Sequence, residues 1–300
     1  MDRKWKYSFA LLLLVAVVVW FAVLTDQDKD KLHLIACDVG QGDAILAIQG
    51  EYQVLIDGGP GSGVTACLDN NLPFYDRTIE MVVLTHPQSD HYRGLIDVFE
   101  RYSVEYLLAT GLDSDSQGYK ELKDAVRING TETVSPDSGK LIRVGEMLLE
   151  VVHPSSAFLA SESTDHVLSV VSENHVLGSF TSSRNPNDFS VVVNLSYGEF
   201  DALLTGDIGP EVIDQVLLTG YVTDVEYLKV PHHGSKNGLT QELLDTSTPE
   251  IAVISVGKNQ WGHPHEEVLE MLEEFGIDTL RTDMNGEVEV VSDGIRWWVN

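Results

Sequence analysis

Residues 81–91 read Met81-Val82-Val83-Leu84-Thr85-His86-Pro87-Gln88-Ser89-Asp90-His91. The stretch begins as an apolar run, typical of a buried strand, and ends with two histidines and an aspartate within six residues. Imidazole and carboxylate groups at the end of a strand are ligands for divalent metals of intermediate softness. Because a polar surface turn has the same composition, this stretch indicates a metal site only if other segments agree with it.

Three more apolar segments end in residues of the same kinds. Segments 52–56, 200–205 and 225–230 are followed by Asp57-Gly58-Gly59, by Gly206-Asp207 and by Pro231-His232-His233-Gly234-Ser235. An α/β sandwich gathers strand ends at one edge, so residues far apart in the sequence can meet there. The sequence therefore predicts one metal cluster drawn from Asp57, His86, Asp90, His91, Asp207 and the pair His232/His233.

The order of these residues resembles the metallo-β-lactamase superfamily, whose pattern is His-x-His-x-Asp-His followed by later His, Asp and His. More closely, the chain resembles the extracytoplasmic hydrolase domain of ComEC-type competence proteins over roughly residues 32–298. The motifs that carry this likeness are Asp38-Val39-Gly40-Gln41-Gly42-Asp43, Asp57-Gly58-Gly59, Asn187-Asp188-Phe189-Ser190, Leu204-Thr205-Gly206-Asp207, Val230-Pro231-His232-His233-Gly234-Ser235, Trp261-Gly262-His263-Pro264 and Arg281-Thr282-Asp283. The resemblance implies an α/β fold, the four-layer αββα metallo-β-lactamase-like sandwich.

The resemblance also implies roles for single residues and a cofactor of one or two divalent ions, zinc or manganese. The implied metal ligands are His86, Asp90, His91, Asp207, His232 or His233, and, by position only, His153. The implied catalytic residues are Asp57, Asp90 and His263, and the implied substrate-binding residues are Asn187, Ser190 and Ser235. Neighbouring side chains diverge along an extended backbone, so only one of His232 and His233 is expected to bind the metal, and the choice stays open.

Position 88 departs from the pattern, since Gln88 stands where the superfamily has histidine. A neutral amide is a poor ligand and adds no negative charge to balance a cation. A single ion or a weakly loaded site is therefore an alternative to a site with two ions.

The first 25 residues differ from the rest of the chain. Arg3, Lys4 and Lys6 precede an uncharged stretch over residues 7–24, which as a helix is roughly 27 Å long, enough to cross a hydrocarbon core. We expect a membrane anchor at residues 1–25, or a signal peptide if this segment is cleaved, then a linker at 26–31 and one hydrolase domain at 32–300. The basic flank places the domain outside the cytoplasm, or in the secreted fraction after cleavage.

Composition limits the partners. The net charge is −28, and it becomes −30 without residues 1–25, which carry three cations and one acid. Such a charge repels polyanions at long range and argues against a broad basic track for DNA, although a metal can neutralise phosphate locally. We expect DNA or another phosphodiester as substrate and no obvious protein partner. A disulfide between Cys37 and Cys67 is permitted outside the membrane, but sequence cannot show their proximity, and we expect two buried thiols.

Hydrophobic periodicity predicts runs of strands followed by helices, twice over. The predicted strands cover 32–37, 43–48, 52–57, 80–84, 104–108, 147–152, 189–196, 200–205, 225–230, 250–255, 286–291 and 294–299. The predicted helices cover 92–102, 117–127, 210–219, 239–245 and 265–275, with one more around Cys67. Segment 155–185 has no helix-length apolar face and is expected to overhang the cluster.

Three functions remain open at this level. The leading hypothesis is a membrane-anchored metal-dependent phosphodiesterase or nuclease of the ComEC type, linked to DNA uptake or processing. The second is a hydrolase of a lactone, thioester or small phosphoester on the same fold. The third is a non-catalytic binding module whose metal site is degenerate at Gln88.

Overall fold

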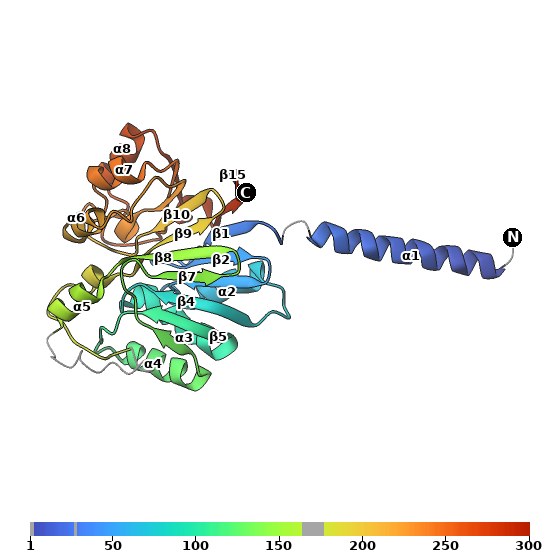
Figure 1. Ribbon diagram of the computed structural model, residues 1–300, viewed down its shortest axis with the longest axis horizontal. Helices are drawn as coiled ribbons and strands as arrows, with labels where there is room; N and C mark the ends of the chain where they lie inside the picture. The colour runs from blue at the N-terminus through green and yellow to red at the C-terminus, as the bar shows by residue number, and fades with distance from the viewer. Residues whose placement is uncertain (1–2, 27–28, 164–176) are drawn as a thin grey trace.

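Two β-sheets form the centre of the computed structural model, which describes residues 3–26, 29–163 and 177–300 (Figure 1). In these residues one sheet has eight strands, in the spatial order β15 (Trp297–Val299), β14 (Val288–Ser292), β1 (Leu32–Ala36), β2 (Ile45–Gln49), β3 (Tyr52–Ile56), β4 (Thr78–Leu84), β5 (Ser103–Ala109) and β6 (Glu132–Val134). The other has seven, in the order β13 (Asp278–Arg281), β12 (Ile251–Ile254), β11 (Tyr227–Lys229), β10 (Phe200–Leu204), β9 (Val192–Tyr197), β8 (Met147–His153) and β7 (Leu141–Val144).

Helices cover the outer face of each sheet. The eight-stranded sheet packs against α2 (Gly63–Asn71), α3 (Ser89–Arg101) and α4 (Gln117–Asn129). The seven-stranded sheet packs against α6 (Pro210–Leu218), α7 (Gln241–Ser247) and α8 (Glu266–Glu274). A third apolar cluster lies between the two sheets. The predicted four-layer αββα sandwich is therefore confirmed.

The alternation of side chains along each strand explains these layers. In β1, Leu32, Leu34 and Ala36 enter the core between the sheets, whereas Ile35 packs on the helical side. Successive side chains of a strand point to opposite faces, and both faces of this sheet are covered. The strands therefore read as nearly continuous apolar runs rather than as an alternating pattern.

The main departures from the predicted elements are short pieces of structure. The unpredicted strands β6, β7 and β13 and the short helix α9 (Thr282–Asn285) have three or four residues each. Helix α5 (Ser156–Glu162) also differs from prediction, since segment 155–185 was expected to lack a helix; the Ser155 hydroxyl caps it by accepting a hydrogen bond from the Phe158 amide. Residues 164–176 of that segment lie outside the described residues, so its position over the cluster stays a prediction.

Helix α1 (Arg3–Asp26) extends away from the two sheets (Figure 1). The part of the chain that the structure describes contains no helix with the length and apolar character needed to cross a membrane. The anchor expected at residues 7–24 is therefore not confirmed.

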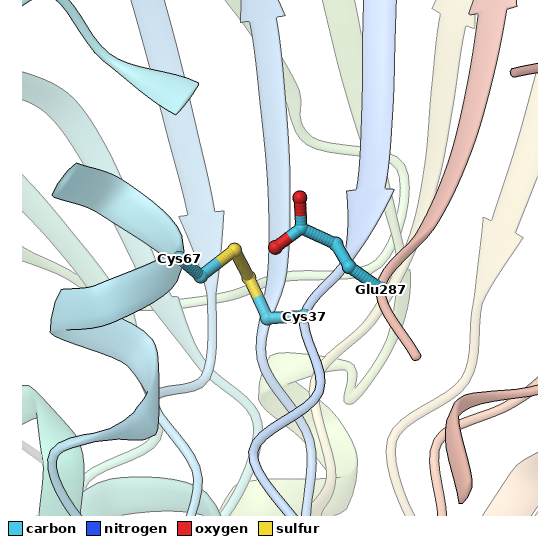
Figure 2. A group of neighbouring side chains, drawn as sticks. All are labelled: Cys37, Cys67 and Glu287. Atoms are coloured by element: carbon cyan, nitrogen blue, oxygen red, sulfur yellow. A yellow bond between two sulfur atoms is a disulfide. The ribbon is translucent and has the colours of Figure 1, made fainter. Parts of the chain in front are cut away.

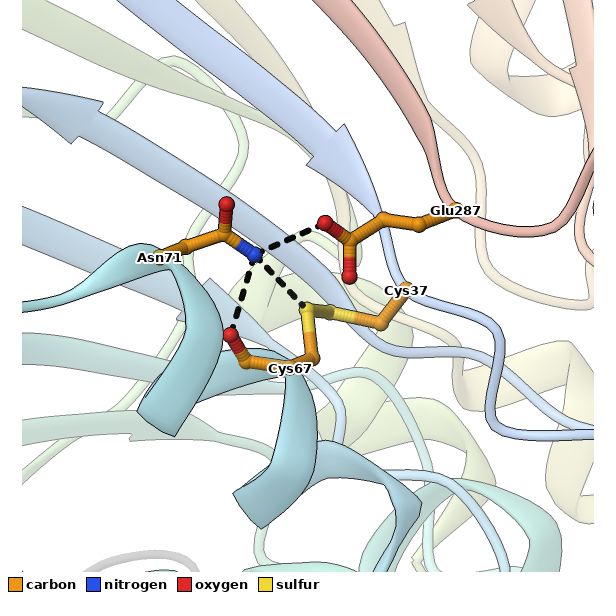
Figure 3. The surroundings of a disulfide bond; sticks show 4 residues. All are labelled: Cys37, Cys67, Asn71 and Glu287. Atoms are coloured by element: carbon orange, nitrogen blue, oxygen red, sulfur yellow. Dashed lines mark hydrogen bonds between the residues drawn. A yellow bond between two sulfur atoms is a disulfide. The ribbon is translucent and has the colours of Figure 1, made fainter.

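A disulfide joins Cys37, directly after β1, to Cys67 on α2, with a Cα–Cα distance of 5.8 Å (Figure 2). The expectation of two separate thiols is wrong, because folding brings together residues that lie 30 positions apart. Asn71 Nδ2 donates to the Cys67 carbonyl (3.0 Å) and to Glu287 Oε1 (2.8 Å), so the end of α2 is also tied to the segment before β14 (Figure 3).

We predict that the double substitution Cys37→Ala, Cys67→Ala lowers the free energy of unfolding by about 3–4 kcal/mol, because the crosslink restricts the unfolded chain over a loop of this length. Urea unfolding of the purified protein measures the change. The matched control is the wild type unfolded with reductant, which should lose a similar amount. Equal stability of the oxidised and the double-variant proteins would contradict the prediction.

Candidate metal centre

The candidate metal centre lies where strand ends of the two sheets meet. Strand β4 leads to His86 and to His91 in the first turn of α3, and β10 leads to Asp207. Gly206 precedes Asp207 with φ +55°, and a Cβ there would lie 2.9 Å from the Ser190 Cβ. A side chain at position 206 would therefore push the two segments apart, and glycine allows the close approach.

Asp57 lies behind the cluster, where it fixes His91. Its Oδ2 lies 2.7 Å from His91 Nδ1, and it accepts hydrogen bonds from the Thr85 amide (2.8 Å) and the Thr85 hydroxyl (2.6 Å). A carboxylate on the outer nitrogen of an imidazole holds the tautomer whose other nitrogen is free. These contacts fit a residue that orients the site, and a catalytic role for Asp57 stays a prediction.

His86 and His233 are held through Nδ1 in the same way. His86 Nδ1 lies 3.0 Å from Thr85 Oγ1 and 3.3 Å from Ser190 Oγ, and His233 Nδ1 lies 2.9 Å from the Ser255 carbonyl oxygen. The Ser255 carbonyl can only accept, so Nδ1 of His233 carries a proton, and Nε2 is the nitrogen that a cation could bind once its own proton is displaced. Ser190 is fully buried and supports His86, whereas we had expected it to bind substrate.

The inner nitrogens converge on a carboxylate. Nε2 of His86, His91 and His233 is buried without a hydrogen-bond partner in each case. Asp207 Oδ2 lies 3.3 Å from His91 Nε2 and 3.4 Å from His233 Nε2. The ligand atoms of His86, His91 and Asp207 lie within 4.8 Å of one another, as do those of Asp90, His91 and His233. Unpartnered imidazole nitrogens around a carboxylate fit a divalent cation.

Two charged residues of this region were not predicted as site residues, Asp43 and Lys229. Lys229 is 1% exposed, and its Nζ contacts the Asp43 carboxylate, lies 3.5 Å from Asp207 Oδ1 and donates to the Gly206 carbonyl (2.9 Å). Asp43 Oδ1 lies 3.2 Å from His233 Nδ1. A lysine inside the apolar segment 225–230 was the available signal, because lysine is almost never fully buried unless it is paired.

Burial and neighbouring charges act in opposite directions on the pKa values of the cluster. Burial disfavours the charged form of His91, but Asp207 and Asp57 outweigh it and raise its pKa to about 10. Burial disfavours ionisation of Asp207, but His233 and His91 hold its pKa well below its ordinary value. Burial and the charge of His91 lower the pKa of His86 to about 3. A bound cation must displace the protons on the imidazoles, because metals bind their neutral form.

A pocket of 310 Å³ opens beside the cluster, and its lining includes Gln41, Gln88, Asp90, Asp207, His232, His233, Ser235, Asn237, Trp261 and His263. Asp90 is partly exposed in it, with Oδ2 3.6 Å from His233 Nε2. His232 lies at the rim, with Nε2 4.0 Å from Asp207 Oδ2. His232 and His233 have φ values of 53° and 54°, and this left-handed turn places His233 inside and His232 at the edge.

Two further implied residues make contacts of other kinds. His153 is buried, with Nε2 3.0 Å from the Asp188 carbonyl oxygen and its ring against Phe158. Asn187 Oδ1 accepts a hydrogen bond from Gln88 Nε2, so each amide engages the other. Sequence position alone suggested His153 as a metal ligand. The sequence does not show that its ring contacts a backbone carbonyl.

Comparison with known proteins agrees with this geometry. The sequence model of the metallo-beta-lactamase superfamily matches residues 37–258, more than half of the chain. The chain belongs to this superfamily, and the predicted resemblance is confirmed.

The chain is also similar to two bacterial proteins in sequence and to one solved structure in fold. The chain is 27% identical over 215 residues to the ComE operon protein 3 of Bacillus subtilis, covering 71% of this chain and 24% of that protein. It is 25% identical over 291 residues to Recombination protein 2 of Haemophilus influenzae, covering 95% and 32%. It thus spans only about a quarter to a third of these relatives. The solved structure of the metallo-beta-lactamase fold protein YhfI from Bacillus subtilis has a TM-score of 0.54 at 10% identity, covering 86% of this chain and 99% of that one.

We predict that His91→Ala or Asp207→Ala lowers the affinity for zinc or manganese at least tenfold, since each removes a ligand around which the others converge. Elemental analysis after metal loading and dialysis measures the loss. His33→Ala is the matched control, because His33 contacts Glu289 (2.7 Å) on the far strand pair β1–β14. Wild type and Asp207→Ala protein with the same metal content would exclude this site.

A second prediction concerns pH. Burial lowers the pKa of His153 to about 4, against 6.5 in its ordinary state, so the folded chain favours the neutral ring. This contribution to stability is complete above pH 6.5 and is lost as the pH falls toward 4. Between pH 7 and pH 4.5, wild type should lose roughly 2–3 kcal/mol more than His153→Gln, as measured by urea unfolding. Parallel pH profiles of the two proteins would show that His153 does not contribute.

Proposed function

We propose that the chain is a metal-dependent hydrolase of phosphodiester bonds, with a nuclease role of the ComEC type in DNA uptake or processing. The supporting observation is the convergence of three unpartnered imidazole nitrogens and the Asp207 carboxylate beside an open pocket. When bound there, a divalent cation supplies a Lewis acid that polarises a phosphoryl oxygen and makes water more acidic. The competence-protein relatives favour a nucleic acid as the substrate.

The residues of the pocket have separate tasks in this proposal. His86, His91, His233 and Asp207 hold the cation. Burial disfavours ionisation of Asp90, but His233 and His91 outweigh it and lower its pKa, so the carboxylate is charged at neutral pH and accepts a proton from the attacking water.

His263 also lines the pocket, where burial and the neighbouring imidazoles lower its pKa to about 4. His263 is thus neutral at pH 7 and offers a hydrogen bond rather than a charge. Ser235 also lines the pocket and is placed to contact a phosphate oxygen.

The proposed cofactor is a single zinc or manganese ion. Gln88 donates a hydrogen bond to Asn187, and its neutral amide is a poor metal ligand. Lys229 Nζ lies against Asp207 Oδ1, which leaves Oδ2 for a cation. Both features support one ion rather than two bridged by Asp207.

An extracytoplasmic location is also proposed. The Cys37–Cys67 disulfide supports it, because disulfides persist in oxidising compartments and are rare in the cytosol. The basic residues before position 7 agree with this orientation. Attachment to a membrane through residues 7–24 stays a prediction.

We predict that Asp90→Asn lowers kcat about 10²- to 10⁴-fold, since it removes the proton acceptor and keeps the shape of the side chain. The assays are hydrolysis of bis-(p-nitrophenyl) phosphate and cleavage of single-stranded DNA with manganese or zinc. Asp97→Asn, on the same helix α3, is the matched control and should keep wild-type rates. Elemental analysis of each variant separates loss of the base from loss of the metal.

Other outcomes select the other functions. Hydrolysis of lactones or thioesters alone would make the chain a hydrolase of small esters. The net charge of −28 repels such substrates less than it repels DNA. If metal-loaded protein turned over none of these substrates, a binding module would describe it better.

A further inference from the structure

Trp261 is a large apolar side chain at the mouth of the pocket. It is 58% exposed, and among the exposed large apolar residues of the described chain it is the one that lines this pocket. A single exposed aromatic residue is ordinary on a protein surface. Two features distinguish this one: it lines the same pocket as Asp90 and His263, and hydrogen bonds hold its loop.

The loop that carries Trp261 is held by one side chain. Asn259 Oδ1 accepts hydrogen bonds from the amides of Trp261 (3.1 Å), Gly262 (2.9 Å) and His263 (3.0 Å). Asn259 Nδ2 donates to the carbonyls of Gly257 (2.9 Å) and His263 (2.8 Å). The backbone under the indole is therefore fixed although the indole itself is uncovered. A ligand that packs on it meets a preorganised surface and loses little loop entropy.

Aromatic rings connect the indole to the cluster. Ring centroids are 6.2 Å apart for Trp261 and His263, with the planes inclined by 30°, and 5.6 Å apart for His263 and His232. His232 in turn lies 4.0 Å from Asp207. A flat apolar surface thus stands next to polar groups suited to a phosphate, which matches the two chemical parts of a nucleotide.

We propose that Trp261 is a stacking subsite for a nucleobase next to the scissile phosphodiester, which makes the pocket selective for nucleotide chains over simple phosphate esters. The inference rests on the proposed phosphodiesterase function and adds the part of the substrate that is recognised. Stacking tolerates any base, because every base has a π-face, and each stacked base is worth about 1–3 kcal/mol.

The charge of the chain makes such a subsite useful. At a net charge of −28, a broad electrostatic contribution to binding a polyanion is unfavourable. Two exposed lysines, Lys236 and Lys258, stand in the same loops as Ser235 and Trp261 and add only local positive charge. Contact with a base face supplies affinity that does not depend on phosphate charge and changes little with salt.

Binding of two labelled single-stranded hexamers to the metal-loaded full chain tests the subsite. One hexamer carries adenine at every position, and the other has abasic sites and the same phosphates. Trp261→Ala should weaken binding of the adenine hexamer about 5- to 100-fold and leave the abasic hexamer unchanged. Trp261→Phe should restore most of the affinity. Phe74→Ala, which removes an aromatic residue that is 84% exposed and outside this pocket, is the control and should change neither.

Equal effects of Trp261→Ala on the two hexamers, or no effect on either, would overturn the proposal. It would also be overturned if wild-type protein failed to prefer the adenine hexamer. Cleavage of bis-(p-nitrophenyl) phosphate is measured in parallel on the wild type. If that activity persists while base preference is missing, the phosphodiesterase assignment stands and only the stacking subsite is lost.

Discussion

The candidate site depends on a balance between buried negative and positive charges where the two sheets meet. Asp43, Asp57 and Asp207 are at most 2% exposed, and an isolated carboxylate in such surroundings is strongly disfavoured. Lys229 and His91 supply the compensating positive charge through contacts with these acids. Removing any one partner leaves a charge unpaired, so the cluster holds together as a unit.

The contacts within this charged cluster also determine which imidazole nitrogen is hydrogen-bonded and which is left for a cation. Asp57 engages the outer nitrogen of His91, and the Ser255 carbonyl engages that of His233. Each contact fixes a ring so that its inner nitrogen lies near Asp207. The candidate metal ligands are therefore positioned by hydrogen bonds that form when the chain folds.

The sequence predicts much of this arrangement, because ligand-type residues follow buried strands and parallel strand ends gather at one edge. It does not predict which of His232 and His233 faces inward, since that depends on a left-handed turn that most residues avoid. The disulfide escaped prediction because proximity of Cys37 and Cys67 exists only in the folded chain. His153 shows the limit of position alone: its place at the end of β8 fits a ligand, yet its ring contacts a backbone carbonyl.

The candidate site lies where the eight-stranded and the seven-stranded sheets meet. His86 and His91 follow a strand of the eight-stranded sheet, whereas Asp207 and Lys229 belong to the seven-stranded one. Neither sheet alone carries all of the candidate ligands. The candidate metal centre therefore exists only where the two sheets have packed together, and a chain in which one sheet has formed without the other lacks it.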